Sequence, residues 1–239
     1  MTRPPQLPLF TLYRRLRELS PAPFAAFLKY GDSALLSASP EQFLKVTPEG
    51  LVETRPIKGT RRRGATGPED ERLAAALLAS EKDRAENLMI VDLLRNDLSR
   101  TCRPGSVAVP ALWILERHPT VHHLVSTVTG VLAPGQGPLD LLKAAFPGGS
   151  VTGAPKVRAM EIIAELEPVC RGPYCGSVGW VGYDGAMDSN IAIRTMVATP
   201  ERLFAQAGGG IVADSDPDAE YDETLIKAYA MLASLEGRQ

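Results

Sequence analysis

Lys58 is the side chain with the clearest potential for covalent chemistry, because of the residues on either side of it. It lies in the pentapeptide Pro56-Ile57-Lys58-Gly59-Thr60. Proline fixes φ on one side and glycine permits close backbone approach on the other, so we expect a rigid connection that presents one amine. Such an amine could act as a nucleophile on a ring. A lone loop lysine is equally compatible with a solvated charge.

Two pairs of carboxylates, each spaced by three residues, open two predicted helices. They are Asp83 with Glu86 and Glu220 with Glu223. Residues three apart share one face of a helix, so each pair projects from a single turn. Acidic residues in a first turn also complement the helix dipole without any further role. Taken together, four carboxylates from two helices would form an oxygen-only site suited to Mg²⁺.

Two glycine-rich segments are candidates for binding an anionic substrate. Residues 148–156 (GGSVTGAPK) place Thr152 and Gly153 in a loop before a predicted helix, whose first N–H groups favour a carboxylate or phosphate. The segment is not a nucleotide P-loop, because alanine follows Gly153 where lysine and Ser/Thr would be required. The glycines at 208–210 would allow a second close approach of the backbone, or simply a tight bend between strands.

Arginine and histidine residues in apolar runs are further candidates. Arg194 falls in the run 191–195, which we expect to be a strand, and a lone charge there usually pairs with an anion, structural or bound. His122 and His123 are consecutive in a predicted strand and therefore point to opposite faces. One of them could face a site, although a hydrogen-bonded core histidine would look the same. No serine or cysteine nucleophile with a recognisable base is visible.

Composition limits the class of protein. The 239 residues suffice for one large domain or two small ones, and 44% hydrophobic content with a formal net charge of −2 is typical of a globular protein. The arginines at 61–63 lack interleaved aromatics and are expected to be a solvated face, so we expect no nucleic-acid partner. No apolar run approaches about 20 residues, so we expect no membrane span. The N-terminus lacks a signal-peptide pattern, and three cysteines without metal-type spacing favour a reduced, cytoplasmic environment.

Hydrophobic periodicity and turn residues predict an α+β fold with antiparallel sheets covered by helices. The first four predicted strands have the pattern of an antiparallel meander. The predicted strands are 25–30, 34–37, 43–47, 51–55, 106–117, 121–132, 174–183, 187–198 and 202–206. The predicted helices are 10–19, 68–80, 81–98, a short one after 134–138, one from 155 to 166 and a last one from 217.

Seven motifs occur in an order that resembles the chorismate-utilising enzymes, and within them the catalytic component of the aminodeoxychorismate synthases. They are residues 39–41 (SPE), 55–60 (RPIKGT), 81–93 (EKDRAENLMIVDL), 121–126 (VHHLVS), 153–156 (GAPK), 206–215 (QAGGGIVADS) and 220–224 (EYDET). The resemblance covers the chain from about Leu12 to its end. It implies one chorismate-binding catalytic domain over residues 1–239, without the family's N-terminal accessory region and first catalytic strand.

The resemblance also implies the site residues. Glu86 and Glu223 would ligate Mg²⁺, with Asp83 and Glu220 helping directly or through water, and the metal would hold the ring carboxylate of chorismate. The residues that match positions around the rest of the substrate are Gly59, Thr60, His123, Tyr174, Arg194, Gly208, Gly209, Gly210 and Lys227. Glu41 matches the general acid that protonates the departing C4 hydroxyl.

Lys58 selects the reaction within this family. In the aminodeoxychorismate synthases that the chain resembles, this lysine attacks C2 and ammonia then adds at C4, whereas anthranilate synthases typically carry alanine here. No cysteine in this chain has a glutaminase arrangement, so a partner amidotransferase would supply ammonia from glutamine. The alternatives are an anthranilate synthase component, an isochorismate or salicylate synthase, and a non-catalytic chorismate-binding chain.

Overall fold

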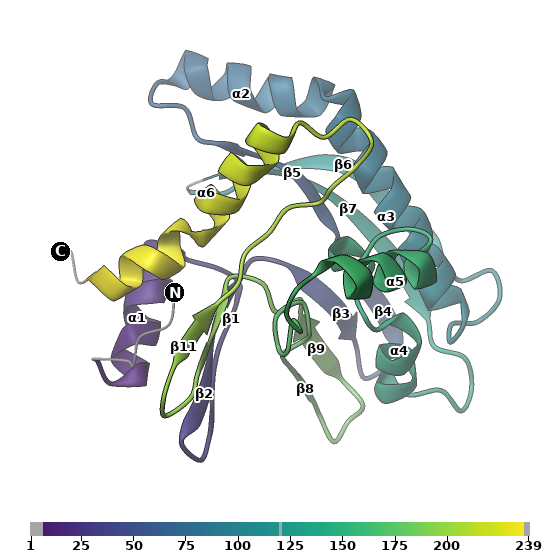
Figure 1. The fold of residues 1–239 in the computed structure, drawn as a ribbon. Helices are drawn as coiled ribbons and strands as arrows, with labels where there is room; N and C mark the ends of the chain where they lie inside the picture. The colour runs from purple at the N-terminus through teal and green to yellow at the C-terminus, as the bar shows by residue number, and fades with distance from the viewer. Residues whose placement is uncertain (1–6, 120, 237–239) are drawn as a thin grey trace. The chain divides into compact units, whose positions relative to one another are not determined.

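The computed structural model describes residues 7–119 and 121–236, and the chain divides into two compact units (Figure 1). Unit 1 comprises Met1–Glu41, Val169–Val178 and Asn190–Gln239, and unit 2 comprises Gln42–Pro168 and Gly179–Ser189. Each unit contains an antiparallel sheet and helices, so the predicted α+β class is confirmed. The expectation that residues 1–239 act as one catalytic domain stays a prediction.

Unit 1 is a four-stranded antiparallel sheet in the order β1-β2-β10-β11. Its elements are α1 (Leu9–Leu19), β1 (Phe24–Tyr30), β2 (Ser33–Ser39), β10 (Thr195–Ala198), β11 (Leu203–Ala205) and α6 (Pro217–Glu236). The pair Gly31-Asp32 closes the β1–β2 hairpin, and Gly31 has a φ of +54°, as such short turns require. Leu12 and Leu16 of α1 pack with Leu36 and Met196 in the core of this unit.

Unit 2 is built on a larger antiparallel sheet in the order β5-β7-β4-β3-β9-β8, with β6 also pairing with β7. Its strands are β3 (Gln42–Val46), β4 (Leu51–Thr54), β5 (Ile57–Arg62), β6 (Ala108–Arg117), β7 (Val121–Val131), β8 (Gly179–Val181) and β9 (Met187–Asn190). Its helices are α2 (Gly67–Ala79), α3 (Glu81–Ser99), α4 (Pro138–Ala145), the 3-10 turn η1 (Gly149–Val151) and α5 (Lys156–Leu166). The residues of β7 from His122 to Ser126 are all buried, as is Val128, and both α2 and α3 contact this strand.

The helices and the first strands lie where the sequence predicts them, but four predictions are wrong. The meander breaks after β2, because β2 pairs with β10 instead of β3. The segment at 57–62 is a strand, β5, and not a rigid connection. The predicted strand 187–198 is interrupted at residues 191–194, where Arg194 has a φ of +49° that a β-strand cannot accommodate. Similarly, only Gly179–Val181 of the predicted strand 174–183 is regular.

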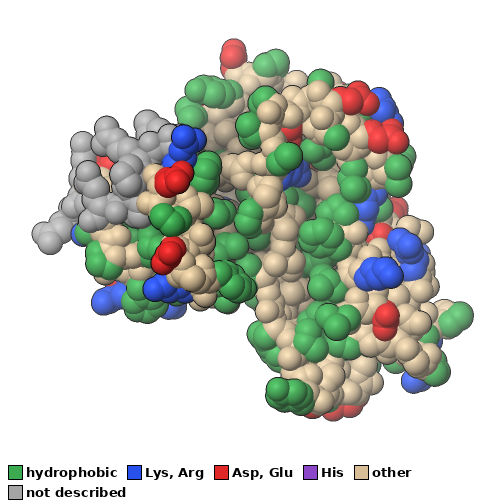
Figure 2. All heavy atoms as spheres, turned by 60° about the horizontal axis from the view of Figure 1, so that its bottom comes forward, with side chains coloured by type: hydrophobic (Ala, Val, Ile, Leu, Met, Phe, Trp, Pro, Cys, Tyr) green, Lys and Arg blue, Asp and Glu red, His purple; other side chains and the backbone are tan. Residues whose placement is uncertain are grey.

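Helix α5 contributes little to the core of unit 2. None of its residues is buried, and Val157 and Leu166 are 72% and 75% exposed. Apolar side chains also lie among scattered charged ones on the face of the molecule shown in Figure 2. Because apolar burial does not hold α5, its position depends on polar contacts at its N-terminal end.

Within the residues that the structure describes, no helix combines the length and the apolar character needed to cross a membrane.

Candidate active site

The predicted site residues are divided between the two units. Unit 2 carries Lys58, Gly59, Thr60, Asp83, Glu86, His123, Thr152 and Gly153. Unit 1 carries Glu41, Tyr174, Arg194, Gly208, Gly209, Gly210, Glu220, Glu223 and Lys227. Each unit therefore brings together its own part of the predicted site.

In unit 2, a bulged stretch of β5 places Lys58 beside α3. The pairing of β5 with β7 shifts register between Ile57 and Thr60, and Gly59 has a φ of +82°. Lys58 Nζ lies 3.7 Å from Glu86 Oε2, and the two side chains are 18% and 15% exposed. The lysine is therefore not a solvated charge: it is a largely buried amine held near a carboxylate.

Gly59 is required by space as well as by backbone conformation. A Cβ at this position would lie 2.8 Å from both Asp83 Cγ and Leu77 Cδ1. Such distances are below van der Waals contact, and φ near +80° is itself costly for any residue with a side chain. Glycine therefore lets β5 approach the start of α3 closely enough for the Lys58–Glu86 contact.

Asp83 has a structural role in addition to its predicted one. It lies three residues after Ser80, the N-cap of α3, whose Oγ accepts a hydrogen bond from the Asp83 N–H at 3.2 Å. Its carboxylate also accepts a hydrogen bond from Arg61 Nη2 at 2.8 Å. Both carboxylates of this helical turn thus face basic side chains from β5, Asp83 facing Arg61 and Glu86 facing Lys58.

His123 is joined to the predicted site by Thr60. Thr60 Oγ1 and His123 Nδ1 are hydrogen bonded at 2.9 Å, and the rings of His123 and His118 have centroids 5.2 Å apart. His122 instead contacts Asp70 of α2 through Nε2 at 2.9 Å. The two histidines have different neighbours, as the prediction of opposite faces requires, and His123 is the one next to the substrate candidates.

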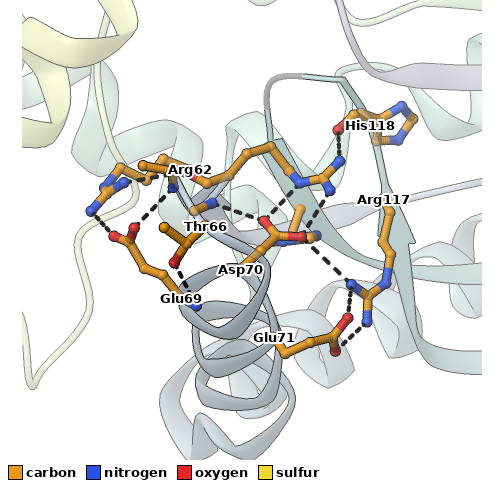
Figure 3. A network of polar contacts seen from close by, with 11 residues as sticks. Arg62, Thr66, Glu69, Asp70, Glu71, Arg117 and His118 are labelled. Carbon is orange, nitrogen blue, oxygen red and sulfur yellow. Dashed lines mark hydrogen bonds and ion pairs between the residues drawn. The ribbon is translucent and has the colours of Figure 1, made fainter.

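Asp70 anchors a polar network at the start of α2 (Figure 3). Its carboxylate accepts two hydrogen bonds from the Arg63 guanidinium and one from the Gly64 N–H, each at 2.8 Å. The same carboxylate is hydrogen bonded to His122 Nε2. Arg63 first, and then the Gly64 N–H, hold the pKa of the Asp70 carboxyl well below its ordinary value. Arg117 adds a bidentate pair with Glu71 at 2.8 Å.

The arginines at 61–63 are therefore not the simple solvated face that the sequence suggested. Arg61 pairs with Asp83, Arg62 with Glu69 at 2.6 Å, and Arg63 with Asp70. The prediction was wrong because the acidic partners lie on α2 and α3 and meet β5 only in the folded chain. Their effect is to attach β5 to the starts of both helices.

Thr152 and Gly153 lie in the loop between η1 and α5. Thr152 Oγ1 donates a hydrogen bond to Gly148 O at 2.9 Å, and Gly153 has a φ of +135°. At the end of this loop, Lys156 Nζ lies 2.7 Å from Asp97 Oδ2 and 2.8 Å from Ala145 O. Burial raises the pKa of the Asp97 carboxyl, and the charge of Lys156 opposes this shift. The Lys156–Asp97 pair thus fixes the loop to the end of α3.

In unit 1, the glycines at 208 and 209 lie against the substrate and metal candidates. A Cβ on Gly209 would be 2.9 Å from Glu220 Oε2, and a Cβ on Gly208 would be 3.5 Å from the Tyr174 hydroxyl oxygen. Lys227 Nζ donates to Gly208 O at 3.2 Å. These contacts bring the backbone of the segment to the start of α6, while the predicted close approach to a substrate stays a prediction.

The two carboxylates of α6 have different surroundings. Glu220 is only 8% exposed, and its Oε1 accepts a hydrogen bond from Ser215 Oγ at 2.6 Å. Glu223 is 52% exposed at its side chain and pairs with Lys227 at 2.5 Å. Glu223 thus keeps the freedom to meet a ligand, while Glu220 is held in place.

Glu41 and Arg194 are also neighbours in unit 1. Glu41 is 6% exposed, and its backbone is fixed because Ile191 N–H donates to Glu41 O at 3.1 Å. Burial lowers the pKa of the Arg194 guanidinium, and the negative charge of Glu41 opposes that shift. An acid and a cation are therefore held near each other in irregular backbone next to β2 and β10.

The predicted metal ligands have the right chemistry, and each unit contains one pair of them. Carboxylate oxygens are the donors that Mg²⁺ prefers. Among the residues that the structure describes, no group of three or more His, Cys, Asp or Glu side chains could hold a metal ion. Each unit supplies two of the four predicted carboxylates, Asp83 and Glu86 in one and Glu220 and Glu223 in the other.

Sequence reasoning missed the basic residues that support these groups. Arg61 and Lys156 both fall in or beside motifs of the family resemblance, but their partners are 22 and 59 residues away. Nothing in local spacing links such residues, so only the pairing of β5 and the packing of α5 could identify their roles.

Comparison with known proteins gives one consistent result. The model of the chorismate binding enzymes matches residues 1–233. The chain is 54% identical over 224 residues to "Aminodeoxychorismate synthase component 1" of Salmonella typhimurium and 50% identical over 228 residues to the protein of that name from Bacillus subtilis. These matches cover 94% and 95% of this chain but 49% and 48% of the relatives, so the chain spans about half of their length.

The solved structures agree with the fold. The anthranilate synthase component I from Streptococcus pneumoniae superposes with a TM-score of 0.87 at 42% identity, covering 96% of this chain and 51% of that one. The predicted chorismate-utilising enzyme fold is thereby confirmed.

Proposed function

Because the chain belongs to the chorismate binding enzyme family, we propose that it converts chorismate and ammonia to 4-amino-4-deoxychorismate, as an aminodeoxychorismate synthase component 1. The observation that carries this proposal is the largely buried Lys58 amine, 3.7 Å from Glu86. Half or more of the aligned residues are identical in relatives with that name. The product would enter p-aminobenzoate and folate biosynthesis.

Lys58 is the nucleophile of the proposed reaction. Its amine nitrogen forms a bond to C2 of chorismate, the ring double bonds shift, and the C4–O bond breaks. Glu41 gives its proton to the departing hydroxyl, which leaves as water. Ammonia then bonds to C4, the double bonds return, and the C2–N bond to Lys58 breaks. The enolpyruvyl group stays attached throughout, so no pyruvate is released.

The remaining candidates bind and orient the substrate. Arg194 and Lys227 supply positive charge for carboxylates of chorismate, and the Gly208–Gly209 backbone leaves room for close approach of the ligand. Tyr174 adds a hydroxyl beside Gly208. Thr60 and His123 form a hydrogen-bonded pair that would line the ring.

We propose that Mg²⁺ is the cofactor, with Glu86 and Glu223 as direct ligands. Asp83 and Glu220 already have short hydrogen bonds to Arg61 and Ser215, which favours a contribution through water. When bound, the metal would neutralise the substrate's ring carboxylate. Two pairs of carboxylates at the starts of helices support this assignment.

We further propose that an amidotransferase subunit supplies ammonia from glutamine in the cytoplasm. The name "component 1" of the relatives implies a second component. Cys102, Cys170 and Cys175 are free thiols in the structure, which suits a reducing compartment.

The decisive experiment is to incubate the purified chain with chorismate, Mg²⁺ and ammonium, determine the product mass and assay pyruvate in parallel. We expect 4-amino-4-deoxychorismate without pyruvate. Anthranilate with pyruvate would instead support the second candidate, which the structural likeness to an anthranilate synthase component favours. Chorismate binding without turnover would overturn catalysis by this chain alone. For a variant that removes the Lys58 amine, Lys143→Ala is the matched control, because Lys143 is exposed and its loss should leave the product unchanged.

A further inference from the structure

Two polar side chains of unit 2, Asn87 and Ser126, are completely buried and bonded to each other. Both are 0% exposed, and Ser126 Oγ donates to Asn87 Oδ1 at 2.5 Å. Asn87 comes from α3 and Ser126 from β7. Neither residue has a part in the chemistry proposed above, yet burying two polar groups is unfavourable unless their hydrogen bonds are made.

The same two residues hold the carbonyl group of Pro56, just before β5. Pro56 O accepts a hydrogen bond from Ser126 N–H at 3.2 Å and a longer one from Asn87 Nδ2 at 3.5 Å. Ser126 Oγ also accepts from the Trp113 N–H at 3.0 Å. The network thus joins α3, β5, β6 and β7 at one buried point.

This point lies next to both members of the Lys58–Glu86 pair. Pro56 precedes Lys58 by two residues, and Asn87 directly follows Glu86. Regular hydrogen bonding between β5 and β7 does not fix the backbone at Lys58, because the register of the two strands shifts between Ile57 and Thr60. On one side of the bulge the Arg61–Asp83 contact fixes the strand to α3. On the other side, the hydrogen bond from Asn87 Nδ2 to the Pro56 carbonyl joins the start of β5 to α3.

We propose that Asn87 and Ser126 are positioning residues that set the distance between Lys58 and Glu86. The Ser126 hydroxyl orients the Asn87 amide, and Asn87 Nδ2 holds the Pro56 carbonyl together with the Ser126 N–H, which Ser126→Ala leaves in place. Neither side chain touches the substrate. Their importance for catalysis rests on the proposed function of Lys58, whereas their effect on the Lys58 side chain does not.

The test compares Ser126→Ala with Ser189→Ala. Ser189 is a matched control: it is 5% exposed, lies in the same unit, and its hydroxyl bridges the N–H and carbonyl of Leu44, away from β5 and α3. Both variants remove a buried hydroxyl, so both should lose some stability. The readout is the rate at which an amine-selective acetylating reagent modifies Lys58, divided by the rate for exposed Lys143 and measured by peptide mass spectrometry.

We expect Ser126→Ala to change this ratio by about fivefold or more, since small free-energy changes shift local populations by such factors. Ser189→Ala should leave it unchanged. In the active enzyme, Ser126→Ala should lower kcat about 10- to 100-fold, with the KM for chorismate within about threefold. Ser126→Thr, which keeps the hydroxyl, should restore both readouts.

If Ser126→Ala does not fold, Asn87→Ala provides the same test. The double variant should lose no more than the worse single one, because the two side chains act as a unit. An unchanged Lys58 to Lys143 ratio, or an effect equal to that of Ser189→Ala, would overturn the proposal. A changed ratio in a chain without synthase activity would instead retain the positioning role and reject the proposed function.

Discussion

The two parts of the candidate site are built in different ways. In unit 2, Lys58 and Glu86 lie on a strand and a helix and are 18% and 15% exposed. In unit 1, Glu223 and Lys227 are 52% and 36% exposed, and Arg194 and the glycines at 208–210 lie in irregular backbone. Unit 2 thus fixes Lys58 and Glu86 by the same contacts that stabilise its fold, whereas unit 1 leaves Glu223 and Lys227 accessible. We therefore expect substitutions of the first pair to affect stability and activity together, and substitutions of the second pair to affect mainly ligand binding.

The largest difference should appear between the two lysines of the site. Lys58→Ala should reduce kcat by about 10³-fold or more, because it removes the proposed nucleophile. Lys227→Ala should raise the KM for chorismate about tenfold and change kcat little, because it removes a binding charge. Steady-state kinetics with saturating ammonium measure both. Full activity of Lys58→Ala under these conditions would falsify the nucleophilic role.

The ion pairs provide a second contrast, this time in stability. Lys156→Met leaves the Asp97 carboxyl buried without its partner, where the pair had side chains 14% and 4% exposed. The free energy of unfolding should fall by about 3 kcal/mol. Lys227→Met breaks an exposed i,i+4 pair and should cost about 0.5 kcal/mol or less. Urea unfolding followed by circular dichroism measures both losses.

Replacing both members of the buried pair is the control for this contrast. Lys156→Met with Asp97→Leu should recover most of the loss, because no uncompensated charge remains. A double variant as unstable as the single one would show that the loss came from the packing of Lys156.

Glycine substitutions should also have different effects on stability in the two units. Gly59→Ala should destabilise unit 2 by about 2–3 kcal/mol, because a φ of +82° is strained for alanine and its Cβ would meet Asp83 and Leu77. Gly209→Ala should cost about 1 kcal/mol or less, since its Cβ would meet the ends of the Glu220 and Glu223 side chains and no backbone atom that the structure describes. The main effect of Gly209→Ala should instead be a weaker affinity of the protein for Mg²⁺.

Tryptophan fluorescence can distinguish these two outcomes. The protein has two tryptophans, Trp113 and Trp180, and both lie in unit 2. The fluorescence midpoint in urea should therefore move for Gly59→Ala and stay in place for Gly209→Ala. Equal shifts would contradict the expected contrast between the two glycines.

The smallest expected effect is a dependence of unit 2 stability on acid. The pKa of Asp70 is lowered in the folded protein, so its stabilising contribution is present above about pH 4 and is lost as the pH falls through the lower folded value. Asp97 has a raised pKa and contributes the opposite slope. Asp70→Asn should flatten the fall of the fluorescence midpoint between about pH 5 and pH 3. An unchanged slope would assign the acid sensitivity to other carboxylates.

Much of the local structure could be predicted from the sequence, because it depends on near neighbours. Helix α1 follows from the spacing of Leu12, Leu16 and Leu19, and α3 begins where Ser80 caps it. The motifs also named residues that the same unit contains, among them Lys58 and Glu86 in unit 2 and Gly209 and Glu220 in unit 1.

The errors arose where pairing partners are distant in the chain. Strand β5 was missed because Pro56 and Gly59 resemble a connection, while its pairing with β7 outweighs that local preference. The pairing of β2 with β10 joins residues such as Ser37 and Thr195, which are 158 positions apart. Arg194 was placed in a strand because apolar neighbours surround it, although its backbone is left-handed.

The sequence by itself determined the residue types of the site, the helices that carry the carboxylates and the resemblance to one enzyme family. These depend on side-chain chemistry, short-range periodicity and the order of motifs. Only the tertiary structure decided that Lys58 is largely buried against Glu86, that Arg61 attaches β5 and Lys156 attaches its loop to α3, and that Asn87 and Ser126 fix the Pro56 carbonyl. Each of these contacts joins segments far apart in the chain, and their hydrogen bonds exist only after hydrophobic burial has brought the segments together.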